Sequence, residues 1–261
     1  MMDGDREMRS RTSLKRKKPP WLLRGRQALK KSRVAGALAS ACVQRLYWLR
    51  WRAGTAARAR RLGFSPDRTY WVSPADIVYC TPLEWNPFWH EGEVRGGDWD
   101  VTDIRFEDLD VFQAMRQRWI EGKDWSETEC YRRAASKIES GRAAWGCASL
   151  AGLDAKCQAL DRLFDEIRQQ GYKSQMELGG GGRMSLRAVD EVSVNVDRDG
   201  KMLFNNSVHR LGIAKLLSVE KIPVRVTVRH SAHVQRERSR LRDRIAGGAA
   251  SGRKEGATRA A

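Results

Sequence analysis

A strict alternation of apolar and polar residues near the C-terminal end constrains this chain more than any other feature. Residues 192–196 place valine at every second position, the pattern of a strand with one buried face. Asp199 and Gly200 form a hairpin turn signal, and residues 202–204 supply the returning strand. A second alternating run, residues 222–228, follows a helical stretch. The pattern therefore predicts two antiparallel strands, a helix and a further strand.

The turn between the returning strand and the helix has an unusual composition. Ser207 is a natural N-cap, so His209 and Arg210 would lie in the first helical turn. An arginine there meets the positive end of the helix dipole, and a bound anion would relieve that conflict while using the open N–H groups. This predicts a phosphate site formed by Asn206, Ser207, Val208, His209 and Arg210. The alternative is that Arg210 pairs with a carboxylate such as Asp98, Asp100 or Asp197.

Two carboxylates follow a pair of glycines in the first part of the central region. A tight bend at Gly96 and Gly97 would expose Asp98 and Asp100, which share one side if the segment is extended. They could then hold a divalent metal such as Mg²⁺ or supply a general base. The alternative is a pair of turn-capping aspartates beside a packed tryptophan, Trp99. We expect Asp98 and Asp100 to lie near the Ser207–Arg210 turn, which makes Asp98, Asp100 and His209 the catalytic candidates.

Three amphipathic stretches separate these carboxylates from the C-terminal strands. Apolar residues recur every three or four positions in residues 104–120, in a stretch opened by a capping box at 126–129, and in residues 150–170. Gly171 stands where a helix of that last range would end. We interpret the stripes as core packing in a helical insertion. The glycines at 179–182 are typical of a flexible linker, with a phosphate-binding loop as the alternative.

Positive charge is concentrated at the two ends of the chain. The 261 residues carry a formal charge of +17, yet the segment between residues 71 and 228 has more acidic than basic side chains. An apolar period runs through residues 34–49 with arginines beside it, which indicates an amphipathic helix. That helix could dock on its own domain, lie on an anionic membrane surface, or bind nucleic-acid phosphates.

These observations predict an α+β protein with four parts. They are a disordered basic tail (1–20), a basic amphipathic helical extension (21–68), an α+β domain (69–232) with a helical insertion at about 104–171, and a basic helix with a disordered tail (233–261).

The longest apolar run is far shorter than the roughly 20 residues of a spanning helix. Five cysteines without a CxxC spacing argue against a disulfide scaffold. We expect a cytoplasmic location, peripheral at a membrane if the basic helix binds lipid.

The segment 191–230, which from residue 192 reads VSVNVDRDGKMLFNNSVHRLGIAKLLSVEKIPVRVTVRH, resembles the signature of the ParB/sulfiredoxin-like superfamily. The earlier WVSPADI is similar to that family's first strand and turn. The resemblance implies a small mixed sheet that binds a nucleoside triphosphate, CTP or ATP, at the turn. It also implies that Arg210 and the N–H groups after Asn206 hold phosphates, with His209 as an auxiliary ligand or proton carrier.

The chain departs from that family at informative positions. Val208 stands where sulfiredoxins carry a catalytic cysteine, which argues against sulfinic-acid reduction. The residues after Val228 leave no room for the DNA-binding helices of chromosome-partitioning members. Three functions remain open: a nucleotide-binding protein that could be a phosphotransferase or hydrolase, a DNA-binding protein or nuclease using the basic ends, and a non-enzymatic accessory protein on a membrane surface. The sequence leaves catalysis undecided.

Overall fold

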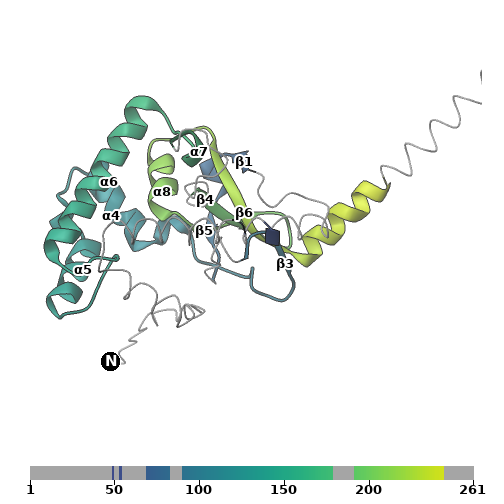
Figure 1. Ribbon diagram of the computed structural model, residues 1–261, viewed down its shortest axis with the longest axis horizontal. Helices are drawn as coiled ribbons and strands as arrows, with labels where there is room; N and C mark the ends of the chain where they lie inside the picture. Colours follow the sequence, from purple (N-terminus) through teal and green to yellow (C-terminus); the bar gives the residue numbers. More distant parts are fainter. Residues whose placement is uncertain (1–48, 50–52, 55–68, 83–89, 179–190, 244–261) are drawn as a thin grey trace, which may run out of the picture. The chain divides into compact units, whose positions relative to one another are not determined.

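A computed structural model of the chain describes residues 49, 53–54, 69–82, 90–178 and 191–243. From residue 69 onward these residues form an α+β domain around a mixed, open sheet of six strands (Figure 1). The strands are β1 (Thr69–Val72), β2 (Tyr79–Cys80), β3 (Glu93–Arg95), β4 (Val192–Val196), β5 (Met202–Asn206) and β6 (Ile222–His230). Their order is β1-β6-β4-β5-β2, and β3 also pairs with β6. The predicted α+β class with a mixed sheet is confirmed.

The β4–β5 hairpin forms as the sequence predicts. The two strands are antiparallel, with Val196 opposite Met202 at the closed end and Ser193 opposite Asn206 at the open end. Gly200 in the connecting turn has φ of 90°, a conformation that glycine adopts without strain. The returning strand extends to Asn206, two residues beyond the predicted end, so the strand leads directly into the candidate phosphate turn.

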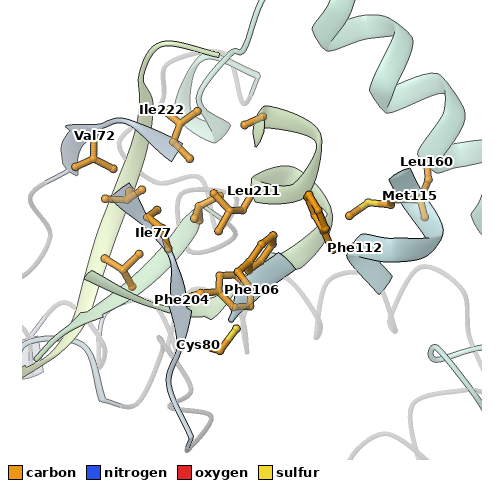
Figure 2. Packing of buried hydrophobic residues seen from close by; sticks show 14 of the residues in the cluster. Val72, Ile77, Cys80, Phe106, Phe112, Met115, Leu160, Phe204, Leu211 and Ile222 are labelled. Atoms are coloured by element: carbon orange, nitrogen blue, oxygen red, sulfur yellow. The ribbon is translucent and has the colours of Figure 1, made fainter. Parts of the chain in front are cut away.

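One face of the sheet carries the main apolar core. Val192, Val194 and Val196 of β4 are buried there, because a strand sends alternate side chains to opposite faces. Figure 2 shows Leu211 of α8 (Val208–Leu216) gathered with Phe106 and Phe204 over this face. The core therefore fixes α8 against the strands from which it emerges.

The opposite face of the sheet holds buried polar groups that bond to one another. Asn195 donates from Nδ2 to Thr81 Oγ1 over 2.8 Å, and Asn205 donates from Nδ2 to Ser193 Oγ over 3.0 Å. Arg225 donates to Glu91 in a buried ion pair. Because these groups satisfy each other away from water, this face is a polar half of the interior.

The helices lie mainly on the apolar side, where α8 packs between the sheet and α4 with α6 (Figure 1). The remaining helices are α4 (Asp110–Trp119), α5 (Glu129–Glu139), α6 (Leu150–Gln170) and α7 (Gln175–Leu178).

The predicted bounds of α6 and its end at Gly171 are confirmed. The helix expected from residue 104 begins only at Asp110, after a 3₁₀ turn. The expected cap at Ser126 is wrong: Thr128 caps α5, and its hydroxyl accepts from the Tyr131 N–H.

Several sequence predictions concern parts of the chain outside the described residues. They are most of the basic amphipathic helix, the glycines at 179–182 and the C-terminal tail from residue 246. In the part of the chain that the structure describes, no helix combines the length and apolar character needed to cross a membrane.

Candidate functional site: the turn into helix α8

The first turn of α8 has no side-chain cap. Ser207 occupies the N-cap position, as predicted, but its backbone has φ of 73° and ψ of 50°, the left-handed region. Its side chain makes no cap to the helix, and Oγ instead donates to the Glu191 carbonyl over 3.3 Å. The Leu211 N–H donates to the Ser207 carbonyl, so the N–H groups of residues 208–210 precede the intrahelical bonds. A left-handed residue followed by a helical one turns such N–H groups toward one concave surface.

The residues around this opening differ in exposure. Asn206 is exposed, and its Oδ1 accepts from the Ser207 N–H over 2.8 Å. Val208 is half-buried and packs against the apolar core. Asn206 is therefore an exposed side chain at the edge of the turn, directly before Ser207.

The Arg210 guanidinium is buried and bonded to the protein, and it is not an exposed group that faces a ligand. The residue is 7% exposed, and its Nε donates to Tyr172 Oη over 3.1 Å. A second nitrogen donates to the Lys173 carbonyl, and the guanidinium carbon lies 4.5 Å from the centre of the Tyr172 ring. The alternative that Arg210 pairs with Asp98, Asp100 or Asp197 is also wrong, because its partners follow α6. Arg210 fixes the first turn of α8 to the segment after α6.

His209 lies against the helical insertion. Its ring meets that of Trp145 edge-on, with 6.4 Å between the ring centres. Burial, together with a smaller effect of the charge of Lys156, lowers the pKa of His209 to about 4. His209 is therefore a neutral, packed side chain at neutral pH.

Asp98 and Asp100 lie elsewhere, in contact with Arg198. Arg198 donates to Asp98 Oδ1 over 2.8 Å and to Asp100 Oδ1 over 2.7 Å. The Asp98 side chain is 84% exposed, whereas that of Asp100 is 2% exposed. The hydrogen bonds from Arg198 lower the pKa of Asp100 to about 2. The segment is a turn and not an extended strand, yet both carboxylates accept from the same Arg198 nitrogen.

The two predicted halves of the site lie at opposite ends of the β4–β5 hairpin. Arg198, with Asp98 and Asp100, is in the closed turn, whereas Ser207 follows the other end of β5. Five residues of strand separate these ends by about 16 Å at ~3.3 Å per residue. The expectation that the carboxylates lie near the turn is therefore wrong. Among the described residues, no three His, Cys, Asp or Glu side chains are grouped to hold a metal.

A different carboxylate, Glu191, borders the turn. It is 4% exposed, and its Oε2 accepts from the Gln175 N–H over 2.7 Å. Burial raises the pKa of Glu191, and the nearby charge of Arg210 lowers it in part. The sequence held a signal for this residue: in an antiparallel hairpin, the residue before the first strand lies beside the residue after the second.

Comparisons of the chain with known proteins do not assign a function to this turn. No family model, no curated protein and no solved structure matches this chain. The functional argument therefore depends on the open start of α8 and on the electrostatics around it.

Proposed function

We propose that this protein binds a phosphate-bearing ligand, a nucleoside triphosphate such as CTP or ATP, at the turn formed by residues 206–210. One observation carries the proposal: Ser207 is left-handed and leaves the start of α8 uncapped. N–H groups at such a helix start form an anion site, because they point outward together and the helix dipole is positive there. The resemblance of residues 191–230 to the ParB/sulfiredoxin-like signature agrees with a phosphate at this place.

The charges around the turn favour an anion. Arg210 lies in the first turn of α8. Lys156 is close enough to lower the pKa of the neighbouring His209. Glu191 opposes them, but burial raises its pKa and so disfavours its negative form. A phosphate would therefore meet a positive helix end with two cations nearby.

Backbone N–H groups, and not side chains, would bind the phosphates of the ligand. Arg210 holds the turn in shape through Tyr172 and the Lys173 carbonyl, and the N–H groups of Val208 and His209 would contact the phosphates. Mg²⁺ would have to enter with the nucleotide, because Asp98 and Asp100 contact Arg198 at the far end of the hairpin. The function proposed for this turn is ligand binding, and no catalytic step is assigned to it.

Calorimetric titration of the full chain with CTP and with ATP, each with and without Mg²⁺, tests this function. The decisive variant is Asn206→Asp, which keeps the side-chain shape and places a negative charge beside the site. Acidic residues stabilise a helix start, so the melting temperature should stay equal or rise. Nucleotide affinity should fall about tenfold, the effect of a like charge a few ångströms from the phosphates.

Lys201→Gln is the matched control, because it lowers the net charge by the same one unit on an exposed residue at the closed end of the hairpin. Its affinity should match that of the unaltered chain. Equal losses in both variants, or no binding of either nucleotide by the unaltered chain, would rule out the turn as the site.

A further inference from the structure

A tight turn in the helical insertion carries an indole at its tip. Ala144 and Cys147 exchange two backbone hydrogen bonds, of 3.0 Å and 2.8 Å, so only Trp145 and Gly146 lie between them. Both central residues have positive φ, 51° for Trp145 and 75° for Gly146, which is the pattern of a type I′ turn. Asparagine, aspartate or glycine is the usual first central residue, and a bulky side chain there is an outlier. Backbone strain of this kind is concentrated at ligand-binding positions in proteins, which makes Trp145 a candidate ligand contact.

Contacts with α6 hold this turn in place. The Lys156 ammonium donates to the Trp145 carbonyl over 2.5 Å, and the Cys147 thiol donates to the Gly152 carbonyl over 3.4 Å. Neither contact uses the indole, so the position of the turn does not depend on the Trp145 side chain. Within the described part of the chain, Lys156 forms no ion pair with a carboxylate. Its charge therefore adds to the positive potential beside Trp145.

Trp145 lies next to the start of α8. Its ring centre is 6.4 Å from that of His209, whose backbone N–H belongs to the first turn of the helix. A second ring, that of Trp125, is 6.5 Å away and also edge-on, so among the described residues no ring is stacked in parallel on the half-buried indole. In a nucleotide one ribose separates the base from the phosphates. An indole that lies one side chain away from the open N–H groups is therefore placed to meet the base.

We propose that the Trp145 indole stacks on the nucleobase of the ligand whose phosphates bind at the start of α8. This inference rests on the function proposed for residues 206–210. Every base has an aromatic face, so stacking adds affinity without selecting one base. The ligand is therefore a nucleotide and not an inorganic phosphate, and the affinities for CTP and ATP should depend on Trp145 to a similar degree.

Calorimetric titration of the full chain with CTP, ATP and inorganic tripolyphosphate tests this inference, because tripolyphosphate has the phosphates and lacks the base. Trp145→Leu keeps an apolar side chain and the backbone contacts of the turn, but it cannot stack on a ring. Its affinity for both nucleotides should fall about tenfold, and its affinity for tripolyphosphate should change by less than about twofold. Trp145→Phe keeps a flat ring and should lose less than about threefold for the nucleotides.

Trp71→Leu is the matched control. Trp71 is exposed on β1, and it lies on the face of the sheet opposite α8 because its neighbours Tyr70 and Val72 pack against the apolar core. This variant should bind all three ligands as the unaltered chain does.

The tripolyphosphate affinity of Trp145→Leu also shows whether the variant is folded. Equal losses for the nucleotides and tripolyphosphate would overturn the inference, because the indole would then only shape the turn. Unchanged nucleotide affinity would overturn it too, and in that case the phosphate site itself would stand. If the unaltered chain bound none of the three ligands, the phosphate site would be rejected and the stacking role with it.

Discussion

The Ser207 hydroxyl donates to the Glu191 backbone carbonyl over 3.3 Å, at the open end of the β4–β5 hairpin. This bond turns the serine side chain away from the N–H groups that a capping serine would occupy. The residue before β4 and the helix after β5 are thus joined by a hydrogen bond that leaves the helix start uncapped. The proposed phosphate site depends on this arrangement.

The left-handed backbone at Ser207 can be tested with two substitutions that remove the same hydroxyl. Ser207→Gly should keep the conformation, so stability should change by less than about 1 kcal/mol and nucleotide affinity by less than about threefold. Ser207→Val should cost about 1–3 kcal/mol, because a β-branched residue disfavours this region, and it should weaken binding strongly. Urea unfolding and calorimetry check both. Equal affinities in the two variants would show that the turn conformation does not matter to the ligand.

Arg210→Ala should destabilise the protein by about 2–4 kcal/mol, because two partly buried hydrogen bonds from a buried charged donor are lost. An exposed arginine in a first helical turn, where the helix dipole opposes its charge, would instead cost little stability to remove. Tyr172→Phe, which removes one of the two acceptors, should cost about 1 kcal/mol. Urea unfolding of both variants is the measurement. A cost for Arg210→Ala within a few tenths of a kcal/mol would show that the guanidinium is available for other contacts.

His209 should make stability depend on pH in a defined window. Its pKa is lowered to about 4 by burial, whereas an unfolded histidine titrates near about 6.5. As pH falls below about 6.5 the unfolded state takes up the proton first, so this contribution is complete above that pH and is lost toward pH about 4. It amounts to about 3 kcal/mol, and His209→Phe should remove it. An imidazole titration followed by NMR with a midpoint near about 6.5 would contradict this.

Glu191→Gln should strengthen phosphate binding. Burial raises the pKa of Glu191, so its favourable contribution to stability is present at low pH and is lost as the pH rises through that pKa. The neutral glutamine avoids this loss, and at about pH 8 it also removes a negative charge beside the turn. Nucleotide affinity should then rise about three- to tenfold, with the difference disappearing on acidification. Calorimetry at two pH values measures this, and weaker binding by the variant would show that the carboxylate contacts the ligand.

The elements with strong local signals could be predicted from the sequence. The β4–β5 hairpin follows from the valine alternation and the Asp199–Gly200 turn, and α6 ends at Gly171 as its spacing predicts. Both depend on interactions between residues that are close along the chain. Such patterns determine which residues form a strand or a helix and where it ends.

The candidate site was harder to predict, because its contacts join distant segments. Arg210 donates to residues after α6, and Arg198 in the β4–β5 turn donates to Asp100 in the turn after β3. No local pattern encodes which loop an arginine will reach. Glu191 could have been found from hairpin register alone, since it stands just before β4 and so beside the turn after β5.

The most direct test of the phosphate site is an NMR titration that follows each backbone amide as CTP or ATP is added. The N–H groups of Val208 and His209 should show the largest shifts, because the ligand would accept hydrogen bonds from them. The same titration with Asn206→Asp should need about tenfold more nucleotide. Shifts confined to the arginines of residues 231–243, with the amides after Ser207 unmoved, would contradict the proposal that the start of α8 holds the phosphates.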